Sequence, residues 1–214
     1  DFAVGEQCSF FDAISVTGTF DGSATINVVN WLGNESNNNK DVGFDALDEV
    51  IINPGDPWNI LSGNDVDGVR IGGSGTDNNT VRGNYIGTNA SGTIAIPNAG
   101  NGIGIYDGAS NNTIGGKAVD SANVIAFCTN EGVQISDSGS NYNRISRNSI
   151  FSNGQLGIAL LGGANGGISM PQIISFNGYL VNGMALPNST IEFFADAEDE
   201  GKIFIDATTA NGSG

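Results

Sequence analysis

The sequence predicts an all-β protein built as a solenoid, in which short repeats stack on one another and bury a shared core. A four-residue pattern, glycine followed by apolar residues at alternate positions, occurs at 68–71, 102–105, 132–135 and 157–160. Each of the first three copies is followed by two further blocks that begin with asparagine and end on an apolar residue. No segment shows helical periodicity, so the repeated unit consists of short strands and turns.

The first 45 residues lack this repeat but contain a strand candidate, Ala24–Val29, after an Asp-Gly-Ser turn. A solenoid needs its open end covered, because a bare edge offers unpaired backbone groups to other strands. We therefore expect residues 1–45 to form an N-terminal β cap, or a strand exchanged with a neighbouring molecule.

Residues 46–165 form the predicted solenoid, in which residues i and i+2 of a strand share a face. Successive coils lie about 4.7–4.9 Å apart, so equivalent side chains stack directly over one another. The expected inward columns are Val69, Ile103, Val133 and Ile158; Ile71, Ile105, Ile135 and Leu160; Val81, Ile114 and Ile145; and Ile86, Ile125 and Ile150.

Three asparagines, Asn84, Asn123 and Asn148, precede the last of these columns at equivalent places. We expect their amides to bond from coil to coil as a structural ladder. The repeat glycines are 34, 30 and 25 residues apart, so the coils carry loops of unequal size. The longest loops, at 88–100 and 116–122, are where recognition is expected.

The segments 83–93, 101–103, 108–116 and 123–125 resemble the right-handed parallel β-helix repeats of secreted and cell-surface prokaryotic proteins. This resemblance covers residues 58–162. It implies a right-handed β-helix with three sheets, export and surface display, and it implies no reaction. The segment Cys8–Ile14 is more faintly similar to a motif that opens many of these proteins.

Residues 166–214 lie beyond the repeat and contain strand candidates at 172–176, 179–181, 190–194 and 203–207. The segment 187–195 resembles the start of an immunoglobulin-like module, which needs about seven strands to close its two sheets. We therefore expect a small, incomplete β-sandwich, whose apolar face and open edge a strand from elsewhere could fill.

The composition limits the partners and the compartment. Seven basic and 23 acidic residues give a formal charge of −16, which disfavours nucleic acid and anionic membranes. No apolar run is long enough to cross a membrane. The chain begins at Asp1, which an exported and trimmed precursor explains economically; a domain excerpt is the alternative.

The cysteines, Cys8 and Cys128, permit a disulfide but do not require one. Calcium is the one cofactor considered, since oxygen-rich loops suit this ion. Its candidate ligands are Asp196, Glu198, Asp199 and Glu200 in one loop, and Asp65 with Asp67 in another. Solvated acidic turns are the alternative interpretation of both loops.

The absence of histidine excludes His-based triads and His-ligated zinc. The remaining catalytic candidates are Asp107 and Asp137, each five positions after its repeat glycine, which should stack on adjacent coils. Their expected separation is close to the ~5–5.5 Å of retaining glycosidases. The alternative is that each bonds the backbone of its own turn.

Three functions remain open. The first is an extracellular structural protein that assembles head to tail with copies of itself into a filament or surface matrix. The second is an adhesin that binds glycans through the loops. The third is a polysaccharide-degrading enzyme that uses Asp107 and Asp137.

Overall fold

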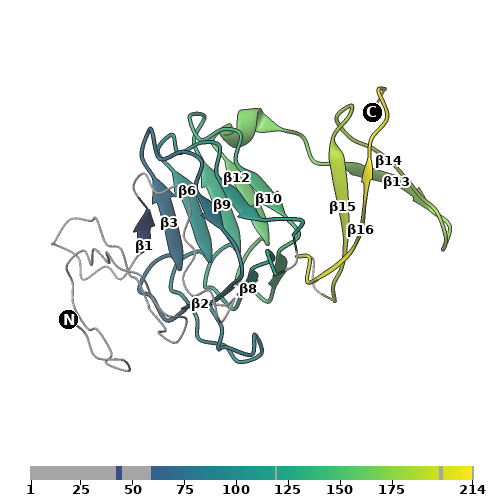
Figure 1. Ribbon diagram of the computed structural model, residues 1–214. Helices are drawn as coiled ribbons and strands as arrows, with labels where there is room; N and C mark the ends of the chain where they lie inside the picture. The colour runs from purple at the N-terminus through teal and green to yellow at the C-terminus, as the bar shows by residue number, and fades with distance from the viewer. Residues whose placement is uncertain (1–41, 45–58, 119, 198–199, 214) are drawn as a thin grey trace, which may run out of the picture.

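The computed structural model describes residues 42–44, 59–118, 120–197 and 200–213 of the chain. These residues are all-β, with parallel sheets of stacked strands followed by two antiparallel hairpins (Figure 1). The described part contains no α-helix, only the short 3-10 helix η1 (Ala164–Gly167). The strand candidate Ala24–Val29 and Cys8 lie outside the described residues, so those predictions stand as predictions.

Three parallel sheets make up the stack, and the chain visits them in rotation. The five-stranded sheet contains β1 (Val42–Phe44), β3 (Val69–Gly72), β6 (Ile103–Tyr106), β9 (Val133–Ser136) and β12 (Ile158–Leu161). The three-stranded sheet contains β4 (Thr80–Val81), β7 (Thr113–Gly115) and β10 (Arg144–Ser146). The four-stranded sheet contains β2 (Asn59–Leu61), β5 (Asn84–Ile86), β8 (Val124–Ala126) and β11 (Ser149–Phe151). This arrangement is compatible with a β-helix-like solenoid.

The strand register confirms the alignment of the columns expected from the sequence, although Ile158, at the open end of its column, is 45% exposed. Ile71 pairs with Ile105, Ile105 with Ile135, and Ile135 with Leu160. The other columns pair in the same way, from Val69 to Ile158, from Val81 to Ile145 and from Ile86 to Ile150. The isoleucines of the middle repeats are fully buried, so these columns form the hydrophobic core.

Side-chain ladders run along the stack at all three places where the chain passes from one sheet to the next. In each ladder an asparagine side chain bonds to the asparagine of the following repeat. Where both partners use their side-chain amides, the distance from Nδ2 to Oδ1 is 2.8–3.0 Å. The first ladder is Asn59, Asn84, Asn123 and Asn148. The second is Asn79, Asn112, Asn143 and Asn165. The third is Asn64, Asn98, Cys128 and Asn153.

Cys128 interrupts the third ladder. Asn98 Nδ2 lies 3.7 Å from Cys128 Sγ, and only the backbone N–H of Cys128 bonds to Asn153 Oδ1, at 3.1 Å. The thiol is 1% exposed, and this burial raises its pKa to about 11. A buried neutral thiol is a weak hydrogen-bonding group, so the ladder is weakest at this repeat.

Cys128→Asn is therefore expected to stabilise the protein, since an amide at this position restores an acceptor for Asn98 and a donor for Asn153. Two net hydrogen bonds at about 1 kcal/mol each predict a gain of about 1–2 kcal/mol. Urea unfolding under reducing conditions measures it. Cys128→Ser is the control, because its shorter side chain cannot span to the next repeat. An Asn variant no more stable than the Ser variant would contradict the ladder's energetic role.

Two hairpins follow the stack. The first pairs β13 (Gln172–Phe176) with β14 (Val181–Met184), and the second pairs β15 (Thr190–Ala195) with β16 (Ile203–Thr209). Three of the four C-terminal strand predictions match these elements. The candidate at 179–181 was wrong in position, because Asn177 Oδ1 accepts the N–H groups of Tyr179 and Leu180 and holds them in the turn.

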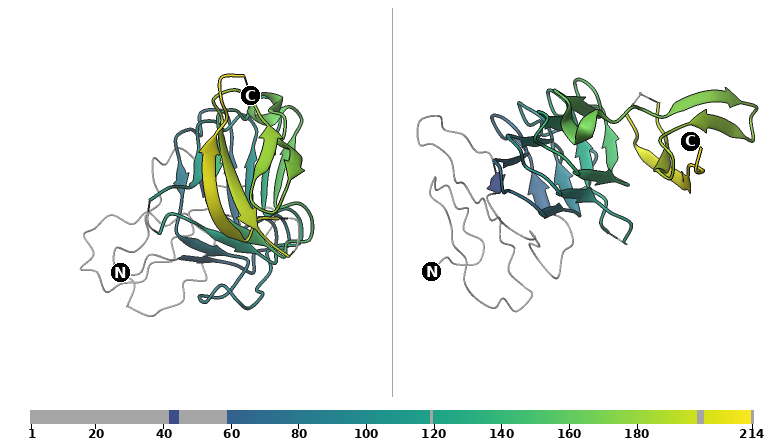
Figure 2. Two further views of the ribbon diagram at one scale, coloured as in Figure 1. Left: turned by 90° about the vertical axis from the view of Figure 1, so that its right-hand side faces the viewer. Right: turned by 90° about the horizontal axis from the view of Figure 1, so that it is seen from above.

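The second hairpin lies against the C-terminal end of the stack, whereas β13 and β14 extend away from it (Figure 2). None of the helical segments in the described part of the chain has the length and apolar character of a membrane span.

Candidate functional site

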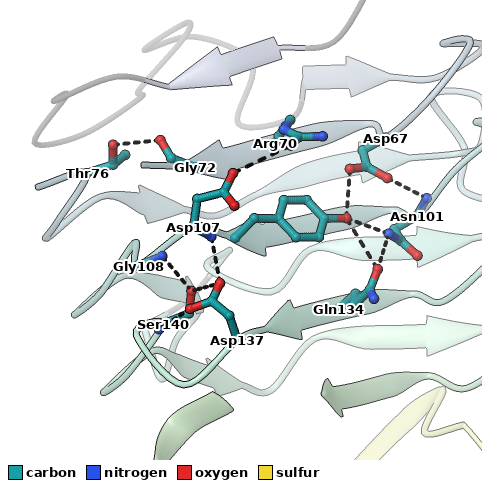
Figure 3. A network of polar contacts seen from close by, with 11 residues as sticks. Asp67, Arg70, Gly72, Thr76, Asn101, Asp107, Gly108, Gln134, Asp137 and Ser140 are labelled. Atoms are coloured by element: carbon teal, nitrogen blue, oxygen red, sulfur yellow. Dashed lines mark hydrogen bonds and ion pairs between the residues drawn. The ribbon is translucent and has the colours of Figure 1, made fainter. Parts of the chain in front are cut away.

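A polar network covers the outer face of the five-stranded sheet (Figure 3). Val69 and Ile71 point into the core, so Arg70 and its strand neighbours Gly104 and Gln134 point outward. Tyr106 folds back over Gly104, where a Cβ atom would clash with the tyrosine ring. The glycine therefore creates the space that the aromatic ring fills.

The Tyr106 hydroxyl connects three repeats. It donates to Asp67 Oδ2 at 2.9 Å and accepts from Asn101 Nδ2 at 2.7 Å. Asn101 Nδ2 also donates to Gln134 Oε1 at 2.7 Å. Asp67 is 2% exposed, and its other oxygen accepts the backbone N–H of Asn101 at 2.8 Å. Burial, with the neighbouring Asp67 carboxylate, raises the pKa of Tyr106 well above its ordinary value.

This raised pKa predicts a loss of stability in alkali. Tyr106 keeps its proton in the folded protein but ionises near pH 10 when unfolded, so its contribution is complete below about pH 10 and falls above it. Tyr106→Phe, which cannot ionise, is expected to lose less stability between pH 9 and 11 than the wild type. Urea unfolding at stepped pH measures the difference, and Tyr142→Phe, at an 82% exposed position, is the matched control. Identical pH slopes for wild type and Tyr106→Phe would contradict the burial of this hydroxyl.

Arg70 completes the outer face. Its guanidinium carbon lies 4.6 Å from the centre of the Tyr106 ring, and its Nη2 lies 3.8 Å from Asp107 Oδ2. The side chains of Arg70 and Asp107 are 43% and 72% exposed. Water therefore screens this ion pair, which contributes little to stability.

The structure brings together Asp107 and Asp137, the two catalytic candidates. Asp137 Oδ2 accepts the backbone N–H of Asp107 at 2.7 Å. Asp137 also accepts from Gly139 N, Ser140 N and Ser140 Oγ at 2.8–3.1 Å. Partial desolvation opposes the effect, but these hydrogen bonds lower the pKa of Asp137. Asp137 thus serves as the acceptor of its own turn and of the adjacent repeat, while the Asp107 carboxylate pairs with Arg70.

The C-terminal end of the stack carries two further carboxylates, Glu192 and Glu200, supplied by the second hairpin. Glu200 accepts the N–H and Nδ2 of Asn153 at 3.0 Å each, in the place where the next asparagine of the third ladder would stand. Glu192 accepts from Ser146 Oγ at 2.7 Å and from Arg147 N at 3.0 Å, beside the end of the first ladder. The hairpin therefore terminates the third ladder through Glu200 and is anchored beside the end of the first through Glu192.

The second hairpin also contacts the edge strand β11. Ile150 N donates to Gly201 O at 3.2 Å, and Ser149 Oγ donates to Lys202 O at 2.7 Å. Lys202 lies over the Phe151 ring at 4.1 Å. The second hairpin thus covers the end of the four-stranded sheet.

The rest of this end remains open. Asn165 ends the second ladder, and Gly166 and Gly167 follow with φ of 68° and 64°, which turn the chain out of the sheet. In the earlier repeats the segment at this position is a strand with an inward valine or isoleucine. This repeat has no such residue, so Ile145 is the last member of its column. The result is a groove of about 780 Å³, which we call the end groove. Its lining comprises Asn141, Tyr142, Asn143, Arg144, Ile145, Ile158, Leu160, Asn165, Gly166 and Ile168.

The structure places some of the remaining candidate residues without testing their predicted roles. Asp196 accepts the N–H groups of Ala197 and Gly201, and Glu200 faces Asn153. Glu198 and Asp199 lie outside the described residues. Within the described ranges, no group of three or more acidic or cysteine side chains is placed to hold a metal ion. Calcium binding and the Cys8–Cys128 pairing stay predictions.

The long loop at 88–100 is internally braced. Thr88 pairs with Ala95 in an antiparallel bridge, and Asn89 Oδ1 accepts the N–H groups of Thr93 and Ile94. The loop displays Ile94, which is 62% exposed. Its predicted role in recognition is not tested by this geometry.

Sequence reasoning missed Glu192, Tyr106 and the end groove. The signal for the groove was present, because Asn165-Gly166-Gly167 occupies the position of the earlier Asn-x-apolar blocks without the apolar residue. No protein-family model, curated protein or solved structure matches this chain.

Proposed function

We propose that the protein is an exported structural subunit that assembles with copies of itself into a filament or surface matrix. Its fold in this proposal is a right-handed parallel β-helix with an N-terminal β cap and a partial immunoglobulin-like module. The resemblance of segments 83–93 and 108–116 to cell-surface β-helix repeats supports export and handedness.

The observation that carries the structural role is the use of the carboxylates. Asp67 and Asp137 each accept a backbone N–H from an adjacent repeat, and Glu192 and Glu200 of the second hairpin each accept a backbone N–H from the end of the stack. Carboxylates used in this way hold neighbouring repeats together, and they are the strongest acceptors available for that purpose. Three ladders of buried amides add to the same effect, which is rigidity along the stack.

Sedimentation velocity and negative-stain electron microscopy of the purified chain test self-assembly. The expected result is a concentration-dependent series of oligomers that grow in one direction. A monomer at every concentration up to the millimolar range would overturn the proposal.

Glycan binding is a second candidate, favoured by the outer face of the five-stranded sheet. There Arg70, stacked on Tyr106, offers hydrogen-bond donors beside the exposed Asp107 carboxylate, an array that suits sugar hydroxyl groups. A glycan array probed with wild type and with Arg70→Ala tests it. Binding that is equal for both proteins, or absent from both, would exclude this face.

A further inference from the structure

We infer that the end groove receives the β13–β14 hairpin of a second copy, an inference that rests on the proposed self-assembly. The groove is the place where the core of the stack stops. Ile158 and Ile168, on opposite sides of η1 in the sequence, are 45% and 52% exposed there. Both β10 and β12 are edge strands of their sheets in the described structure. Apolar surface beside open strand edges favours the binding of an extended or hairpin segment.

The β13–β14 hairpin has the complementary character. Every residue of both strands is exposed, including Phe176 at 68%, and Tyr179 in the turn is fully exposed. An isolated two-stranded hairpin is only marginally stable in water. Burying the turn of this hairpin against a second apolar surface would stabilise it and remove that surface from water.

Charge favours another copy as the occupant. The chain carries a formal charge of −16, so two copies repel each other over most of their surfaces. The segment 171–187 contains no charged residue, and the charged side chain that lines the end groove is Arg144. Contact between these two surfaces buries no carboxylate, and the guanidinium of Arg144 is a cation–π partner for Tyr179.

The direction of the hairpin determines the kind of assembly. Its turn points away from the stack of its own molecule (Figure 2), so the hairpin reaches outward and leaves its own end groove open. A contact between two different surfaces is heterologous, and it propagates into a filament unless its rotation closes a ring.

The test combines groove and hairpin variants of the full chain in sedimentation velocity. Ile158→Lys and Ile168→Lys place a charge in the end groove at half-exposed positions. Phe176→Ser with Tyr179→Ser removes the apolar turn without changing the charge. Ile94→Lys, in the loop at 88–100, is the control with the same charge change. Thermal unfolding confirms that each variant is folded.

We expect each groove variant, and the hairpin variant, to be at least tenfold weaker in self-association than the wild type and Ile94→Lys. An equimolar mixture of a groove variant and the hairpin variant should form a one-to-one dimer that does not grow, because each retains one intact surface. Groove variants that assemble like the wild type would overturn this inference while leaving self-assembly intact. A monomeric wild type would overturn both.

Discussion

Asn123→Ala is expected to destabilise the protein by about 3–5 kcal/mol, since a buried hydrogen-bonding group left without a partner costs about 1–3 kcal/mol. Asn123 is fully buried, and its Oδ1 accepts from both the N–H and the Nδ2 of Asn84 at 3.1 and 2.8 Å. Its Nδ2 donates to Asn148 Oδ1 and to Val81 O. Removing the amide breaks the first ladder at its middle and leaves groups of the neighbouring repeats unsatisfied.

Urea unfolding followed by circular dichroism measures this loss. Asn182→Ala is the matched control, because Asn182 lies on the exposed first hairpin and should change stability by less than about 0.5 kcal/mol. Equal effects at both positions would show that the ladder contributes no more than a surface amide does.

Glu200→Ala is expected to cost about 2–3 kcal/mol, since hydrogen bonds to a charged group contribute about 1.5–3 kcal/mol. The carboxylate replaces the missing next asparagine of the third ladder, and it fixes the second hairpin to the end of the stack. Without it, we expect the backbone amides of Asn153 and Ile150 to lose protection. Hydrogen exchange measured by NMR or mass spectrometry reports this opening directly.

Glu200→Gln separates the contribution of the hydrogen-bond acceptor from that of the negative charge. Glutamine keeps an acceptor oxygen but no charge, so it should recover about half of the lost stability. Asp206→Ala is the control, because Asp206 accepts only a local N–H in the described contacts of β16. Unchanged exchange at Asn153 in Glu200→Ala would show that the hairpin is held by its other contacts.

The columns of the core could be predicted from the sequence because they depend on a local pattern. In each repeat the apolar residues stand at fixed positions after a glycine or an asparagine. Parallel stacking of the repeats then aligns equivalent apolar side chains. Ile71, Ile105 and Ile135 pair in this way without any further information. The same reasoning placed Asn84, Asn123 and Asn148 at equivalent positions, where the structure joins them by hydrogen bonds.

Other features depend on contacts that no local pattern encodes. The third ladder was hidden because Cys128 breaks the asparagine series, although Asn64, Asn98 and Asn153 each stand four residues before a repeat glycine. Glu192 and Glu200 look like ordinary surface acids until the hairpin is placed against the stack. Tyr106 stands at an outward-facing position of the alternating pattern, as an ordinary strand residue would. Only the absence of a side chain at Gly104 lets its ring fold back across the sheet.

The ladders also have a mechanical consequence. Their bonds join each repeat to the next, so tension applied along the stack is carried by three ladders and three sheets in parallel. The hydrogen bonds of one ladder cannot stretch alone, because the bonds of the other two ladders and the strand pairs between the same two repeats must break with them. Among the repeats that contribute a strand to all three sheets, such a rod resists load until one whole interface between repeats gives way, and the interface beside Cys128, with its missing amide, is where extension would begin.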